Sequence, residues 1–94
     1  MNDVKRLKRA IRAVHGCNSK HLQTYLVHEQ MDGKTVWEGD VEEFELIQCP
    51  EAKNAFAWHY QDGADIRSVI VLKLPPVQTA RDAVQVAILS GEQK

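Results

Sequence analysis

Histidine and cysteine side chains that could hold a metal ion gather near the N-terminal end of the chain. His15, Cys17 and His21 have the spacing H-x-C-x3-H, and a fourth ligand would have to come from farther along, such as Cys49 or His59. Structural zinc sites usually combine two close ligand pairs, such as two C-x2-C elements, and this chain has none. The spacing therefore predicts no metal site and no cofactor.

Nucleophilic and acid–base chemistry is also poorly supported. Cys17 follows the end of an expected helix, where the negative end of the helix dipole disfavours a thiolate. Glu38, Asp40 and Glu42 recur at a spacing of two, which is typical of the solvated surface of a strand. The glycine-rich phosphate-binding motifs and the nucleophile motif G-x-S-x-G are absent from the sequence. We therefore expect no catalytic residues, and a non-enzymatic role is favoured.

Charge is distributed unevenly along the chain. Residues 1–20 hold six basic side chains against one acidic, and residues 29–51 hold one basic against eight acidic. One interpretation is that a basic helix lies near an acidic strand and the two neutralise each other. The other is a nucleic-acid contact, in which basic side chains bind phosphates and aromatic side chains stack on bases. The residues expected to contact nucleic acid or a protein partner are Lys5, Arg9, Arg12, Tyr25, Trp58 and Tyr60.

A helix is expected at each end of the chain. In the first, apolar residues recur at steps of three and four between an N-cap at Asp3 and an end at Gly16. In the second, Thr79 to Asp82 resembles a capping box, and a narrow stripe of small apolar residues follows as far as Gly91. The small residues would let this helix approach a sheet closely.

Four strands are expected between the helices, at about residues 21–29, 35–47, 55–61 and 66–74. The Asp32-Gly33 pair between the first two favours a hairpin turn, because glycine accepts a positive φ. In the third strand, Phe56, Trp58 and Tyr60 alternate with Ala55, Ala57 and His59. Aromatic residues at a spacing of two are typical of an inner sheet face.

The second strand has an irregular apolar pattern. Trp37 and Val41 share one parity, whereas Phe44 and Leu46 share the other. Because successive side chains of a strand point to opposite faces, a bulge or bend near Gly39 and Asp40 is expected to bring all four to one side.

These elements predict an α+β fold. The expected architecture is a four-stranded antiparallel meander sheet with an N-terminal and a C-terminal helix, α-β-β-β-β-α, in a two-layer sandwich. Ninety-four residues make a single domain, 1–94, with frayed ends at 1–2 and 92–94. If both helices cover one face, the other face stays open for binding.

Cysteine content and hydropathy predict a cytoplasmic protein. Two cysteines, Cys17 and Cys49, are too few for a secreted disulfide scaffold, so reduced thiols are expected. No run approaches the roughly 18 apolar residues that a membrane span requires, so no membrane contact is expected.

The segments TVWEGDVEEFEL and PEAKNAFAW, preceded by HGC, resemble a family of short bacterial proteins that has no assigned activity. The resemblance covers most of the chain and implies a bacterial, single-domain, cytosolic protein.

The sequence thus favours a small non-enzymatic cytosolic domain that acts through protein–protein contacts, as a homodimer or an accessory subunit, using a sheet face or an edge strand. The alternative is a nucleic-acid-binding module that uses the basic N-terminal helix. A third hypothesis, a small enzyme or ligand-binding protein with a pocket between helix and sheet, would require a deep cavity lined by His21, His59 or Cys49.

Overall fold

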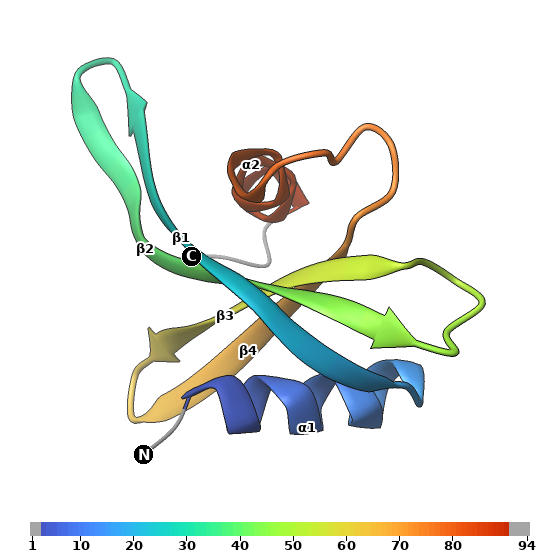
Figure 1. The fold of residues 1–94 in the computed structure, drawn as a ribbon. Helices are drawn as coiled ribbons and strands as arrows, with labels where there is room; N and C mark the ends of the chain where they lie inside the picture. Colours follow the sequence, from blue (N-terminus) through green and yellow to red (C-terminus); the bar gives the residue numbers. More distant parts are fainter. Residues whose placement is uncertain (1–2, 91–94) are drawn as a thin grey trace.

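The structure, a computed structural model, describes residues 3–90 and contains two helices and four strands within them. The elements follow the expected order, α-β-β-β-β-α, and are shown in Figure 1. Their bounds are α1 Asp3–His15, β1 Asn18–Met31, β2 Lys34–Ile47, β3 Asn54–Asp62, β4 Asp65–Leu72 and α2 Ala80–Ser90. The ends expected to fray, 1–2 and 92–94, and the expected helix end at Gly91 lie outside the described residues.

The sheet is an antiparallel meander in the order β1-β2-β3-β4, as the sequence predicts. Asp32 and Gly33 form the β1–β2 turn, both with positive φ. β1 and β2 pair over almost their whole length, whereas β2 pairs with β3 only from Glu42 to Glu45. The far half of the β1–β2 hairpin therefore extends beyond the rest of the sheet and bends toward α2 (Figure 1).

The two helices lie on opposite faces of the sheet, so the expected two-layer arrangement is wrong (Figure 1). In β3, Ala55 and Ala57 pack in a cluster with α1, and Phe56 and Trp58 pack in a second cluster with α2. Both faces of β3 are apolar, and each apolar face must be covered to keep water out. The result is three layers: helix, sheet, helix.

The same arrangement explains the apolar pattern of β2. Val41 packs toward α2, whereas Phe44 and Leu46 pack toward α1. β2 is in regular register with β1 through Gly39 and Asp40, so the bulge expected there is wrong. The register shifts lie instead beside Leu22 in β1 and Val36 in β2. No bulge is needed at Gly39, because each face of the strand has its own helix to cover it.

Gly39 has a packing role. The ring of Trp37 lies over it, and a Cβ at this position would be 3.2 Å from the Cη2 atom of Trp37. Trp37 also makes an edge contact with buried Trp58, at a centroid distance of 5.7 Å. The glycine thus lets an indole ring lie flat on the strand and seal the core under α2.

α2 has an N-terminal cap and is joined to the hairpin by an ion pair. Its capping box is confirmed, because the Asp82 N–H donates to the Thr79 hydroxyl at 3.1 Å and the Thr79 N–H donates to the Asp82 carboxylate at 3.2 Å. The Gln78 N–H also donates a hydrogen bond to the Asp82 carboxylate. This bond contributes most to keeping the pKa of Asp82 below its ordinary value, and the bonds with Thr79 add to it. Arg81 pairs with buried Glu29 of β1. Ala80, Ala83 and Ala87 are buried against the sheet, as their small size predicts.

No helix within residues 3–90 is long and apolar enough to cross a membrane.

Candidate functional site

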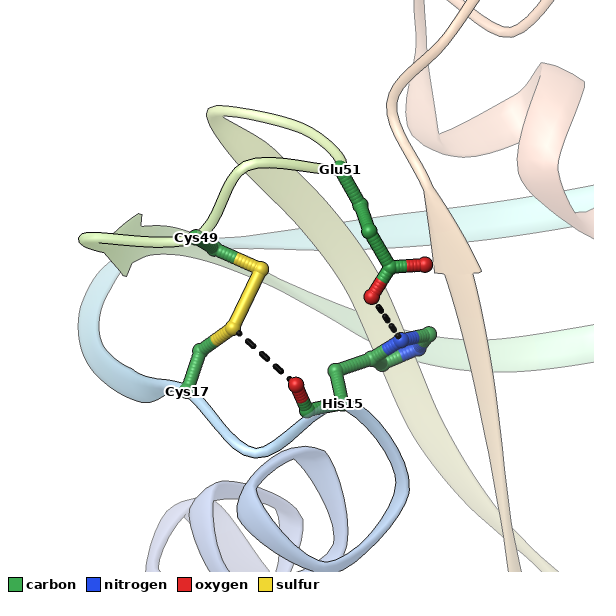
Figure 2. Close-up of a disulfide and its surroundings, with 4 residues drawn as sticks. All are labelled: His15, Cys17, Cys49 and Glu51. Carbon is green, nitrogen blue, oxygen red and sulfur yellow. Dashed lines mark hydrogen bonds and ion pairs between the residues drawn. A yellow bond between two sulfur atoms is a disulfide. The ribbon is translucent and has the colours of Figure 1, made fainter.

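Cys17 and Cys49 form a disulfide bond in the structure, whereas the sequence predicts reduced thiols (Figure 2). The two Cα atoms are 5.6 Å apart, within the usual range for such a bond. Cys17 lies between α1 and β1, and Cys49 lies two residues after β2. Antiparallel pairing of β1 with β2 brings the start of β1 and the end of β2 together. The bond therefore ties the end of α1 to the β2–β3 connection.

His15 lies beside the disulfide, and its Nδ1 atom is 3.2 Å from a carboxylate oxygen of Glu51 (Figure 2). His21 is turned elsewhere: its Nε2 atom is 2.8 Å from Glu42, and its ring packs edge-on against Phe44. The residues of the H-x-C-x3-H spacing therefore have separate partners. Among the described residues, no three histidine, cysteine or acidic side chains converge as metal ligands.

The acidic segment of β2 is divided between solvent and core. Glu38 and Asp40 are exposed, as expected of a solvated strand. Glu42 is buried, so its expected place at the solvated surface is wrong; it accepts hydrogen bonds from Thr24 and faces His21. A hydroxyl and an imidazole on β1 offset the cost of removing this carboxylate from water.

Buried Glu43 is the centre of a partly buried polar cluster. Its carboxylate accepts hydrogen bonds from the Tyr25 hydroxyl at 2.7 Å, the Asn54 amide at 2.8 Å and the Lys73 ammonium at 3.2 Å. Burial alone would raise the pKa of Glu43, but these donors outweigh it and the pKa is lowered. The hydrogen bond to Glu43 raises the pKa of Tyr25. The cluster joins β1, β2 and β3 to the end of β4, and all its groups are mutually satisfied.

The residues expected to contact nucleic acid do not form one surface. Lys5, Arg9 and Arg12 are exposed on α1. Trp58 is only 1% exposed and lies under α2 on the opposite face of the sheet. Tyr25 and Tyr60 pack partly buried against that same α2 cluster. The aromatic side chains are thus structural, and the sheet separates them from the basic helix.

The basic side of α1 is not neutralised by the acidic strand. No ion pair joins Lys5, Lys8, Arg9 or Arg12 to any residue in the described range 3–90. At 100° per residue these four side chains fall on one side of the helix. The buried glutamates have other partners: Glu29 pairs with α2, and Glu42 and Glu43 are held by side chains of the neighbouring strands.

Besides a hollow of about 440 Å³ that His59 lines together with Arg6 of α1 and Ser68 of β4, three surface hollows are relevant to function. The largest, about 610 Å³, follows β4 from Ile66 to Ile70 and is flanked by Val14 and Tyr60. A second, of about 240 Å³, lies between α1 and the start of β1 and is lined by Lys8, Arg9, Arg12, Asn18 and Ser19.

A third hollow bears on the ligand-pocket hypothesis. It has a volume of about 190 Å³ and is lined by Leu7, Asp40, Glu42, Trp58 and His59. Of the three residues named for that hypothesis, only His59 lines it. The hollow is small compared with pockets for drug-sized ligands, which are about 300–1,000 Å³.

Sequence reasoning missed two features here. Ser19 was not singled out, although it begins an edge strand directly below the basic residues of α1. Glu43 is not singled out by the sequence, because it lies in an acidic run. The available signal was its position between Val41 and Phe44, whose opposite parity indicates that both faces of this part of the strand are covered.

The architecture defines the chain as an α+β domain whose four-stranded meander has one helix on each face. Comparisons with protein-family models, with curated proteins and with solved structures find no match to this chain. The resemblance to short bacterial proteins therefore stays a prediction.

Proposed function

We propose that this chain is a small non-enzymatic domain that acts through protein contacts, pairing with a second copy of itself along β4. The observation that supports this most is the hollow that follows the β4 edge. Strand order leaves β4 with one neighbour, so its outer side has backbone groups available for a further strand. Beside this edge lie the exposed apolar side chains of Val14 and Ile66, which are 67% and 57% exposed.

The two edges of the sheet differ in a way that favours β4. β1 contains a register shift beside Leu22, which interrupts its regular edge, and carries exposed Lys20. Bulges and lysines are devices that discourage strand addition. β4 pairs with β3 without a shift from Asp65 to Leu72. Arg67 also lines the hollow, so each edge carries a basic residue, and the regular register and apolar neighbours of β4 make it the better template for a further strand.

A second copy is the occupant that the hollow fits by symmetry. Its strand lining runs from Ile66 to Ile70, with Ser68 at the centre. Antiparallel pairing of two β4 strands about Ser68 sets Ile66 opposite Ile70 of the second copy, and the reverse contact follows from the two-fold axis. The sheets of the two copies would join into one.

The test is the solution mass over a concentration series, by sedimentation equilibrium, for the protein and two variants. Ile66→Lys introduces a charge at the proposed interface, and Leu89→Lys introduces the same charge at an exposed aliphatic residue on α2. Each substitution occurs twice in a symmetric dimer, so Ile66→Lys should weaken dimerisation at least about tenfold. Circular dichroism checks that both variants are folded. A protein that is monomeric at about 1 mM, or equal loss in both variants, contradicts the proposal.

A second candidate, nucleic-acid binding through α1, is favoured by one observation: the exposed cations of the helix lack carboxylate partners within residues 3–90. Because the aromatic residues lie across the sheet, the contact would be to phosphates alone and would be insensitive to base sequence. Fluorescence anisotropy with single-stranded RNA and duplex DNA at 50 and 200 mM salt, about the range over which phosphate contacts weaken, tests it. Binding that is absent at low salt, or unchanged in Lys5→Gln/Arg9→Gln, rejects this candidate.

A cytosolic location is proposed on composition alone. Disulfides are rare in the cytosol, so in that compartment the Cys17–Cys49 bond would be reduced and both cysteines would react with an alkylating reagent applied to intact cells. Protection of Cys17 and Cys49 from the reagent would place the protein in an oxidising compartment instead.

A further inference from the structure

A hollow between α1 and the first residues of β1 has the character of an anion site. It encloses about 240 Å³ and is lined by three basic residues of the helix and two polar residues of the strand, namely Lys8, Arg9, Arg12, Asn18 and Ser19. No acidic residue lines it. The three cations have no ion pair with a carboxylate in the described part of the chain. No carboxylate in this part of the chain therefore offsets the repulsion between these three positive charges.

Ser19 gives the hollow a polar floor. Ser19 is only 6% exposed, and its hydroxyl oxygen is shielded from solvent. Among residues 3–90, this oxygen has no hydrogen-bond partner. Ser19 pairs with Leu46, which packs toward α1, so the serine side chain also lies on the α1 face. Buried hydroxyl groups are usually hydrogen-bonded, because an unmade bond costs free energy. A ligand oxygen in the hollow would supply the missing partner.

Side-chain charge must dominate this site, because the helix dipole opposes it. Arg12 lies in the last turn of α1, where the dipole contributes roughly half a negative charge. Three full positive charges outweigh this. The guanidinium groups of Arg9 and Arg12 are suited to an oxyanion, since each can donate two parallel hydrogen bonds to two oxygens of one phosphate.

We propose that this hollow binds a phosphate group, with Lys8, Arg9 and Arg12 supplying charge and Ser19 donating a hydrogen bond from its hydroxyl. The volume is below the roughly 300–1,000 Å³ of pockets that enclose a whole drug-sized ligand. It suits a terminal phosphate whose remaining structure projects into solvent.

The site is independent of pairing along β4, which lies at the other edge of the sheet. The proposal names the chemical group that nucleic-acid binding through α1 would use, but the site can bind phosphate even if the protein does not bind nucleic acid. The phosphate could belong to a nucleic-acid backbone or to a small phosphorylated molecule. Inorganic phosphate, ribose 5-phosphate and an eight-nucleotide RNA distinguish the sources, because a diester backbone lacks the doubly charged terminal phosphate.

The test is a titration followed by amide and arginine side-chain NMR signals, with ionic strength held constant by sodium chloride. We expect saturable shifts at Asn18, Ser19 and Arg12 with inorganic phosphate. Arg12→Gln should weaken binding at least about tenfold because it removes a charge-assisted pair of hydrogen bonds. Ser19→Ala should weaken it about fivefold through loss of one hydrogen bond. Because it removes an unsatisfied buried hydroxyl, Ser19→Ala should fold as stably as the parent protein.

Two control variants complete the design. Lys34→Gln removes a cation at the hairpin turn, far from the hollow, and Lys5→Gln removes one from the same side of α1 that does not line it. Both should bind phosphate within about twofold of the parent protein, since screened charges outside the hollow contribute little. The proposal is overturned by the absence of saturable shifts, by equal losses in the control variants, or by unchanged affinity in either Arg12→Gln or Ser19→Ala. RNA that fails to bind while inorganic phosphate binds rejects only the nucleic-acid candidate.

Discussion

Replacing Tyr25 by phenylalanine should weaken the fold in a way that depends on pH. The substitution removes the 2.7 Å hydrogen bond from the Tyr25 hydroxyl to Glu43 and keeps the edge contact of the ring with Phe56. A hydrogen bond to a charged group contributes about 1.5–3 kcal/mol. Asn54 and Lys73 still hold the carboxylate, so we expect a loss of about 2 kcal/mol at pH 7, or a melting temperature lower by about 8–16 °C.

The sign of the pH effect follows from the two pKa directions. The pKa of Glu43 is lowered by folding, so its contribution to stability is present above its ordinary value of 4.5 and is lost as pH falls through the folded value. The pKa of Tyr25 is raised by folding, so its contribution is present below its ordinary value of 10.0 and is lost as pH rises above it. The difference between parent and variant should therefore be largest between these limits.

The assay is urea unfolding of the parent protein, Tyr25→Phe and Tyr60→Phe between pH 3 and pH 9. Tyr60 lies on the same sheet face, and its hydroxyl makes no hydrogen bond within the described residues, so Tyr60→Phe should change stability by less than about 0.5 kcal/mol. Protonation of Glu43 should reduce the Tyr25→Phe effect to about half, because hydrogen bonds to charged groups are roughly twice as strong as neutral ones. A Tyr25→Phe loss below about 0.5 kcal/mol at pH 7, or one that stays constant down to pH 3, would refute this account.

Three further changes test other parts of the fold. Cys17→Ser/Cys49→Ser, or reduction, opens a link across 32 positions of sequence and should cost about 3–4 kcal/mol in urea unfolding, with no difference between reduced parent and double variant. Gly39→Ala places a Cβ against the Trp37 ring and should lower the free energy of unfolding by about 1 kcal/mol. It should also weaken the near-ultraviolet circular dichroism signal of the Trp37–Trp58 contact, and an unchanged spectrum would contradict this prediction. Thr79→Ala removes the N-cap of α2 and should cost about 1 kcal/mol, whereas Thr79→Ser should be nearly neutral in thermal melts.

Several expectations concerned chemistry between residues close in sequence, and these were met. The capping box at Thr79 and Asp82 and the hairpin turn at Asp32-Gly33 each depend on contacts or dihedral angles within four residues. The alternation of aromatic and small residues in β3 placed Phe56 and Trp58 on one inner face. The element order followed from these local signals, because each strand or helix shows its own period.

Burial of polar groups was not predictable in this way. Glu42 and Glu43 lie in an acidic run that is typical of a solvated strand, yet both are enclosed. Glu43 is stable there only because Tyr25, Asn54 and Lys73 reach it from other strands and from the end of β4. Donors that are 11 to 30 positions away in sequence have no local pattern that marks them as partners.

The sequence by itself determined the elements, their order and the aromatic inner face of β3, since these depend on local periodicity. Only the tertiary structure decided that α1 and α2 cover opposite faces, that Cys17 meets Cys49, and that Ser19 lies under the cations of α1. The physical reason is that each apolar face of a strand must be covered, whereas the path of the connecting chain decides which helix covers which face.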